Sequence, residues 1–223
     1  MSTRNRYRLT SQLSEEDLPV AASLAAKAFA DSPPYVEILP GDKNRNGARE
    51  GFLAWMFERN FLLRLDDECF RCTYDGDKLV SFFLFIKPGL RHPSFWDMLR
   101  VGLLTGLFSY GLGVFRRLLV TKSWFEDKER EVLGERSGTM VRLERMTVLP
   151  EYQGKGIGTH ALSSALEEAD EGGLSVVLAT QEKRNVAFYK RLGFKVVDER
   201  HVDIGKGYTS WMMVREPNRE THT

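Results

Sequence analysis

The chain has 223 residues, of which 42% are hydrophobic and 28% are charged, which is within the range of one large globular domain or two small ones. Its 32 basic and 31 acidic residues give a net charge of +1, and this balance provides no electrostatic basis for binding nucleic acid. Residues 1–18 contain no apolar signal core, and the longest uncharged run, 101–115, is shorter than the about 20 residues that span a bilayer. We therefore expect a cytoplasmic protein that makes no contact with a membrane.

The first half of the chain alternates strand and helix patterns. Ser14 precedes a run with helical apolar spacing, and serine is a typical N-cap residue of a helix. The two later strand patterns are separated by Asp-Gly-Asp-Lys, which indicates a hairpin. In order, we predict a strand, a helix, a turn-rich loop, a second helix and two strands, over residues 7–13, 15–30, 32–47, 48–65, 68–74 and 79–86.

Residues 87–138 form a helical segment rich in Leu, Phe and Trp, and we read its last part, 126–138, as a charged linker. Beyond it the pattern is regular, with strand, helix, strand, helix and two strands over 139–149, 159–171, 174–180, 186–192, 195–199 and 211–215. This alternation predicts an α/β (α+β) fold, a mixed sheet of about seven strands with helices on both faces. Residues 216–223 read as a disordered tail.

Cys69 and Cys72 form a CxxC pair, a spacing that occurs in metal and redox sites. They lie in an extended segment, where residues three apart point to opposite faces of a strand. No second Cys or His pair has ligand spacing. We therefore expect no metal and a reducing compartment.

Three alternating glycines, Gly154, Gly156 and Gly158, stand between a predicted strand and a predicted helix. No Walker A string is present. The GxGxxG dinucleotide fingerprint is also absent, because Thr159 occupies the place of its last glycine. A loop that ends at a helix N-terminus aims several backbone N–H groups at one point, where the helix dipole favours an anion. A tight turn would need only one glycine. The three therefore indicate a phosphate-binding loop, because side chains at these positions would keep the anion away from the backbone.

Two motifs in this half resemble the signatures of the GNAT N-acetyltransferase superfamily. Gln153-x-x-Gly156-x-Gly158, after a strand ending at Val148, is similar to the acetyl-CoA motif, and the segment 185–194 (NVAFYKRLGF) resembles the second signature. The region 139–214 also resembles puromycin N-acetyltransferases, whereas 87–138 departs from the family pattern. The resemblance implies one N-acetyltransferase domain over 1–223, with a helical insertion at 87–138, an acetyl-CoA-binding core at 139–215 and a sheet splayed in its middle.

The resemblance also implies how acetyl-CoA binds as co-substrate, without a metal. Its pyrophosphate would lie on the amides of the glycine loop, and its pantetheine arm would run along the free edge of the preceding strand. Asn185 would contact this arm, and it also reads as the N-cap of its helix. The implied cofactor-binding residues are Met146, Thr147, Val148, Gln153, Gly154, Lys155, Gly156, Ile157, Gly158, Thr159, Asn185 and Tyr189.

Acetylation of an amine requires a proton acceptor, because an alkylammonium group has a pKa of about 10. Glu144 shares a strand face with Met146 and Val148 by period two, so it is our predicted base, acting through water. The alternative is that Glu144 forms an ion pair with Arg142 or Arg145. An amide near Val148 would stabilise the oxyanion. Tyr189 is the predicted catalytic acid, with core packing as its alternative role.

We thus predict an N-acetyltransferase that moves the acetyl group of acetyl-CoA to a primary amine of a small molecule or protein by direct attack in a ternary complex. The acceptor site would be built from 31–40 and 87–138, and the protein would be a monomer or homodimer. Two other hypotheses are a catalytically silent acyl-CoA-binding sensor and a membrane-surface protein that uses 99–120.

Overall fold

The computed structural model describes residues 6–39, 47–90, 93–103 and 105–218. In this part of the chain seven strands form one sheet in the order β1-β2-β3-β4-β5-β7-β6. Among the described strands only β4 and β5 pair in parallel, so the predicted mixed sheet is confirmed. The strands are β1 (Tyr7–Thr10), β2 (Phe70–Asp75), β3 (Lys78–Ile86), β4 (Val141–Val148), β5 (Val176–Thr180), β6 (Lys195–Val202) and β7 (Tyr208–Arg215).

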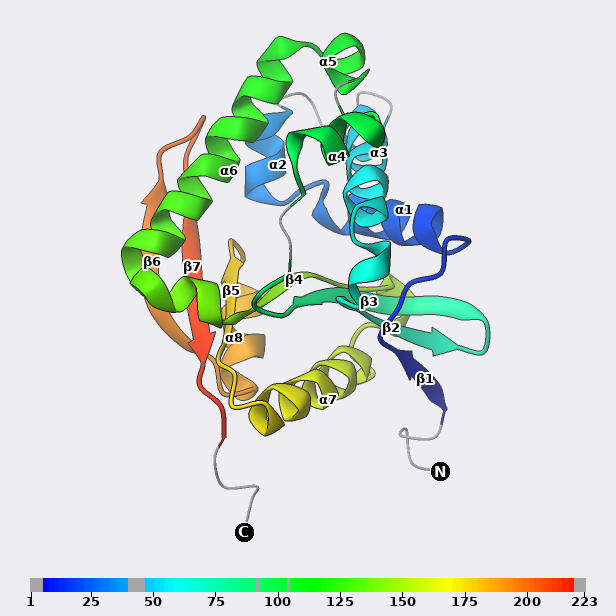
Figure 1. Cartoon of the computed structure of the whole chain (residues 1–223), viewed down its shortest axis with the longest axis vertical. Coiled ribbons are helices and arrows are strands. Elements are labelled where there is room, and N and C mark those ends of the chain that lie inside the picture. The colour runs from blue at the N-terminus through cyan, green and yellow to red at the C-terminus, as the bar shows by residue number, and fades with distance from the viewer. Residues whose placement is uncertain (1–5, 40–46, 91–92, 104, 219–223) are drawn as a thin grey trace.

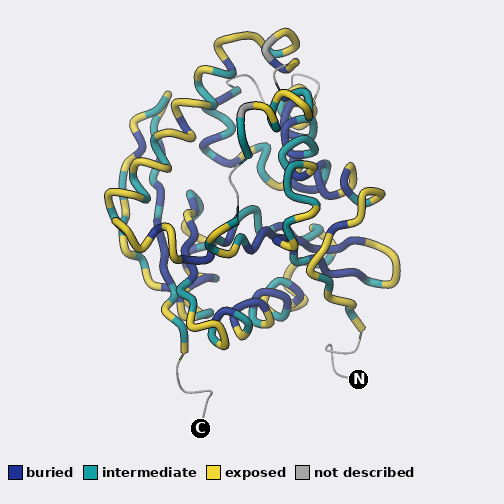
Figure 2. Tube along the Cα trace, viewed as in Figure 1, coloured by how far each residue is buried: buried dark blue, intermediate teal, exposed yellow. Residues whose placement is uncertain are grey.

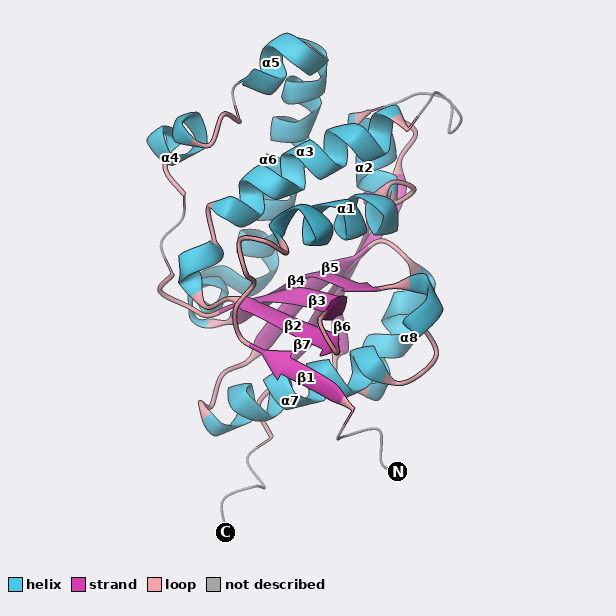
Figure 3. Ribbon diagram, turned by 90° about the vertical axis from the view of Figure 1, so that its right-hand side faces the viewer, coloured by secondary structure: helices cyan, strands magenta, loops and turns pink. Residues whose placement is uncertain are grey.

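Helices cover both faces of the sheet, as predicted (Figure 3). One face, called the upper face here, carries α1 (Leu18–Phe29), α2 (Pro33–Ile38), α3 (Ala48–Leu62), α4 (Phe95–Arg100), α5 (Thr105–Tyr110) and α6 (Leu112–Leu133). The lower face carries α7 (Ile157–Glu171) and α8 (Lys183–Arg191). In Figure 1, α6 runs from α5 at the top of the molecule down to β6 at the far edge of the sheet.

The hydrophobic core divides into an upper and a lower part, one on each face of the sheet. The upper core, between the sheet and α1 and α3, includes stacked Phe57 and Phe61, whose ring centroids are 5.7 Å apart. Phe61 meets Phe82 of β3 edge-on at 5.5 Å. The lower core lies between the sheet and α7 and α8, and Leu162 of α7 is fully buried in it. Figure 2 shows these buried faces turned toward the sheet.

Two predictions about loops are wrong. Residues 32–47 contain the short helix α2, which begins at Pro33, and proline is favoured at a first helical position because its missing N–H has no partner there. Residues 126–133 continue α6 and are not a linker. Their charges pair along the helix, for example Arg130 with Asp127 at 2.6 Å, and such pairs support a helix.

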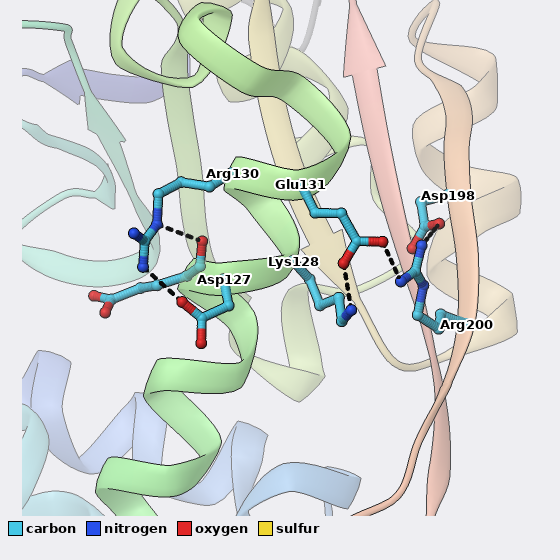
Figure 4. Close-up of polar contacts among 7 residues, drawn as sticks. Asp127, Lys128, Arg130, Glu131, Asp198 and Arg200 are labelled. Atoms are coloured by element: carbon cyan, nitrogen blue, oxygen red, sulfur yellow. Dashed lines mark hydrogen bonds and ion pairs between the residues drawn. The ribbon is translucent and has the colours of Figure 1, made fainter.

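The C-terminal part of α6 is tied to the edge strand β6. Glu131 of α6 accepts a hydrogen bond from Arg200 of β6 at 2.8 Å, and Arg200 also binds Asp198 (Figure 4). Hydrogen bonds from Lys128 and Arg200 lower the pKa of Glu131 to about 2. The carboxylate therefore stays charged in any ordinary buffer. Its contact with Arg200 joins α6, which spans the upper face from its top, to this edge of the sheet.

The two cysteines are free thiols in the upper core, and they do not lie on opposite faces. Cys69 precedes β2 and follows Glu68, whose φ is 48°, so strand alternation does not apply to it. Burial raises the pKa of Cys69 to about 11 and that of Cys72 to about 12. Among the described residues no group of three or more His, Cys, Asp or Glu side chains could hold a metal ion.

The described part of the predicted disordered tail is held against the domain. Glu216 accepts a hydrogen bond from Arg136 at 2.6 Å, and the backbone N–H of Asn218 donates to Asp170 at 2.7 Å. Residues 219–223 lie outside the described residues. In the part of the chain that is described, no helix has the length and apolar character needed to cross a membrane.

Candidate active site

The sheet opens between β4 and β5. These strands pair only at Val141 with Val176 and at Arg142 with Val177, whereas β5 pairs with β7 as far as Thr180. From residue 143 onward, β4 therefore has a free edge that faces the free edge of β5. The splay implied by the sequence is present, and it leaves backbone groups available to a ligand.

A β-bulge in β4 accompanies this opening. Phe82 of β3 lies opposite Thr147, and Leu84 lies opposite Glu144, so one residue of β3 faces two of β4. Arg145, one of these two, has a φ of 54°, which is uncommon for a residue with a side chain.

The bulge reverses the alternation of side chains along β4. Met146 packs into the lower core, and a Cβ on Gly158 of α7 would lie 3.0 Å from Met146 Cε and 3.3 Å from Val148 Cγ2. Glu144 instead pairs with Arg145 on the upper face. The prediction that Glu144 shares a face with Met146 and Val148 is therefore wrong, because one extra residue moves all later side chains to the other side.

Arg145 lies among Phe57, Glu144 and Tyr35. Its guanidinium carbon lies 5.5 Å from the centre of the Phe57 ring, and it forms an ion pair with Glu144. Burial acts to lower the pKa of Arg145, but Glu144 and Tyr35 more than offset this and raise it. Burial raises the pKa of Tyr35, and Glu144 adds to that rise. Of the two predicted partners of Glu144, Arg145 is the one that the structure shows.

The peptide groups of Val148 point into the gap. The N–H of Leu149 donates to the carbonyl of Val80 at 2.9 Å, while Val148 lies opposite Ser81. Antiparallel ladders alternate, so the N–H and C=O of Val148 face away from β3. The C=O accepts a hydrogen bond from Gln153 Nε2 at 3.0 Å, which ties the glycine loop to the end of β4.

The three glycines of the loop have different roles. Gly154 and Gly156 have φ values of 74° and 77°, and a Cβ on either would meet no atom within 4 Å. They are required by the left-handed backbone, which glycine adopts without strain. Gly158 has an ordinary backbone, and its lack of a side chain lets α7 approach Met146 and Val148. Packing, and not clearance for an anion, explains Gly158.

The N-terminus of α7 faces the cleft with unpaired donors. The helix begins at Ile157, two residues before the predicted start, and its first intrahelical bond runs from the His160 N–H to the Gly156 carbonyl at 2.9 Å. The N–H groups of Ile157, Gly158 and Thr159 therefore have no partner within the helix. An anionic pyrophosphate fits such a terminus.

Tyr189 is fixed by the end of α8. Gly193, with a φ of 88°, donates to the carbonyl of Lys190 at 3.1 Å, and Phe194 donates to that of Tyr189 at 3.1 Å. This is a Schellman motif, and the Phe194 ring makes the accompanying contact with the Tyr189 ring at 5.6 Å. Only 8% of Tyr189 is exposed, and burial raises its pKa, so its hydroxyl stays protonated.

Asn185 is not the N-cap of α8, because the helix begins at Lys183 and Glu182 occupies the cap position. Its side-chain amide instead donates to Thr180 Oγ1 at 3.4 Å, at the end of β5. The prediction missed the first turn of α8, because the polar residues before Val186 show no apolar periodicity from which a helix could be recognised.

One cleft of about 2370 Å³ gathers every predicted site residue except Lys155. Lys155 instead lies over the ring of Tyr152 at 5.0 Å. The volume exceeds the roughly 300–1,000 Å³ of a pocket for one small ligand, so there is room for two. Met56 and Asn60 of α3 line the opposite wall. The sequence did not identify them, since helical spacing marks such residues only as core.

Comparison with known proteins agrees with this geometry. Residues 117–194 match the model of the acetyltransferase (GNAT) family. The arylalkylamine N-acetyltransferase 2 from Aedes aegypti has a similar structure, with a TM-score of 0.64 and 14% identity over 96% of this chain and 100% of that one. The histone acetyltransferase HPA2 and related acetyltransferase from Corynebacterium glutamicum has a TM-score of 0.59 and 16% identity, over 97% and 99% of the two chains.

A third structure is the paia N-acetyltransferase from Thermoplasma acidophilum, solved in complex with coenzyme A. Its TM-score is 0.54 and its identity 15%, over 97% of this chain and 99% of that one. Identities this low show a shared fold only. The family match covers residues 117–194, and with these structures it shows that the chain has the fold of the GNAT acetyltransferases.

The Schellman motif yields a stability prediction. Gly193→Ala places a methyl group at a φ of 88° and should lower the free energy of unfolding by about 1–2 kcal/mol. Gly51→Ala is the control, because Gly51 lies inside α3 and an added Cβ meets nothing within 4 Å; it should raise that free energy by up to about 1 kcal/mol. Urea unfolding measures both. Equal stabilities for the two variants would contradict the assigned role of Gly193.

Proposed function

We propose that the protein transfers the acetyl group of acetyl-CoA to a primary amine, by direct attack while both substrates are bound. The observation that carries the proposal is the gap between β4 and β5, with the N-terminus of α7 at its outer end and Tyr189 and Glu144 lining the same cleft. The resemblance of residues 139–214 to puromycin N-acetyltransferases is part of the proposal and rests on the two sequence motifs.

The backbone holds the donor substrate in this proposal. The pyrophosphate binds the free N–H groups of Ile157, Gly158 and Thr159, and the pantetheine arm lies along the free edge of β4 at Met146–Val148. The N–H of Val148, which points into the gap, donates to the carbonyl oxygen that becomes negative during attack. Asn185 contacts the arm from the other side of the gap.

Glu144 removes the proton of the attacking amine. Its side chain is 38% exposed although it pairs with Arg145, so water can carry a proton to the carboxylate. Arg145 keeps the carboxylate in place above the opening of the sheet. The ion pair and the role of base are therefore compatible.

Tyr189 assists the departure of coenzyme A. As the C–N bond forms and the C–S bond breaks, the sulfur takes the electron pair of the C–S bond and becomes a thiolate. Tyr189 is protonated and fixed, so its hydroxyl donates a hydrogen bond or its proton to that sulfur. The nitrogen of the adduct gives up its second proton, which replaces any proton that Tyr189 has given to the sulfur, and the proton on Glu144 returns to water as the amide and coenzyme A leave.

Binding and turnover test the proposal separately. Acetyl-CoA at 100 times its dissociation constant should raise the free energy of unfolding by about 2.7 kcal/mol, which a thermal shift detects. A thiol-release assay with propylamine, octylamine, spermidine and a lysine peptide should then show turnover with at least one amine. A thermal shift with no thiol release from any amine would indicate an acyl-CoA sensor and contradict the proposal.

Tyr189→Phe tests the acid. The ring and its contact with Phe194 remain, so stability and acetyl-CoA affinity should be unchanged, while the rate should fall by about 10- to 1,000-fold. The loss should be smaller with an activated thioester whose leaving thiol is more acidic, since that thiolate needs less help. Wild-type rates with both donors would assign Tyr189 to packing.

Glu144→Gln tests the base through its pH profile. Without a base, only amine that is already neutral can react, so log kcat/KM should rise with pH toward the pKa of the amine, about 10, and approach the wild-type value there. An equal loss at all pH values would mean that Glu144 serves only to pair with Arg145. Circular dichroism of the variant checks that Arg145 without its partner does not unfold the domain.

A further inference from the structure

The cleft continues beyond the reacting groups into an apolar chamber beneath α4 and α6. The polar end of the cleft, near β4, holds Glu144 and Arg145. The other end is lined by hydrophobic side chains of the 87–138 segment, among them Met98, Leu103, Leu118 and Leu119, together with the charged Arg116 and Lys122. The amine of a bound acceptor must lie at the polar end, so the rest of the molecule faces this wall.

The apolar wall reaches the surface. Six of the ten exposed large hydrophobic side chains among the described residues lie between residues 96 and 120. Three of them, Leu112 at 76% exposed, Leu119 at 62% and Val120 at 47%, also line the cleft. Figure 2 shows exposed residues along this part of α6. Clustered apolar side chains at the edge of a cleft favour an apolar ligand, because binding removes them from water.

The wall is a packed part of the domain. Tyr110 of α5 meets Phe52 of α3 edge-on at 4.8 Å, and a Cβ on Gly106 would lie 2.2 Å from the ring of Trp55. Arg117 of α6 donates to the carbonyl of Ile38 in α2 at 2.7 Å. The chamber is thus formed before a ligand binds, and little ordering is needed on binding.

We propose that the acceptor is a primary amine with an extended apolar tail, which the chamber holds while the amino group reaches Glu144. This inference rests on the proposed function and specifies its substrate class. The ammonium group gives one proton to Glu144, the neutral nitrogen bonds to the acetyl carbon, and the C–S bond breaks. The second proton of the nitrogen ends on the sulfur, so coenzyme A leaves as its thiol. The tail takes no part in the chemistry and contributes binding energy alone, so it raises kcat/KM.

A series of unbranched alkylamines from propylamine to octylamine tests the tail. The basicity of the amine is almost constant along the series, so only apolar area changes. Each buried methylene can raise kcat/KM by up to about four-fold, and we expect a rise of at least about ten-fold across the series. Spermidine, which is of similar length but charged along its chain, should react more slowly than octylamine.

Two variants locate the effect. The double variant Leu112→Gln, Leu119→Gln should reduce the ratio of kcat/KM for octylamine to that for propylamine by at least about three-fold, because less apolar surface meets the tail. Val197→Gln is the matched control: Val197 is 44% exposed on β6 and does not line the cleft, so this ratio should stay at the wild-type value.

The outcomes separate the tail from the chemistry. Equal kcat/KM for propylamine and octylamine, or a preference for spermidine, overturns the apolar acceptor and leaves the acetyltransferase proposal standing. Octanoyl-CoA reacting faster than acetyl-CoA with propylamine also overturns it, because the chamber would then hold the acyl chain. Absence of thiol release with every amine overturns both proposals.

Discussion

Arg145 adopts a left-handed backbone conformation inside β4, at a cost of about 1–2 kcal/mol for a residue with a side chain. The ion pair with Glu144 and the position over Phe57 stabilise the residue there. The bulge that results turns Met146 to the lower face and leaves Glu144 on the upper one. Without it, Met146 would turn to the upper face, and every side chain of β4 after Glu144 would lie on the opposite side.

The rest of the site is assembled around the end of this strand. Gln153 binds the carbonyl of Val148, and Gly158 lets α7 pack against the side chain of the same residue. The free amides of α7 are thereby held beside the free edge of β4. On the other side of the gap, the Schellman motif at Gly193 fixes Tyr189. In the proposed complex, backbone groups thus supply most of the binding surface for acetyl-CoA, and few side chains are needed.

The proposed acceptor side is built differently. Its walls come from α2, α3 and the segment 87–138 that contains α4–α6. Side-chain contacts hold them in place, such as those of Arg117 with α2 and of Glu131 with β6. Solved structures of this fold resemble the chain at 13–17% identity, which shows the fold and leaves the acceptor to be read from these walls. Their apolar character is the basis for an apolar acceptor.

The sequence alone determined the seven-stranded α/β architecture and the position of the glycine loop between a strand and a helix, because strand alternation, helical spacing and glycine placement are local properties. Its motifs also single out Tyr189 and Gly156 as proposed site residues. Tertiary structure decided what depends on distant contacts: the bulge at Arg145, the face on which Glu144 lies, the helical state of 126–133 and the chamber beneath α6. A strand register is set by its partner, and period two holds only until a bulge interrupts it.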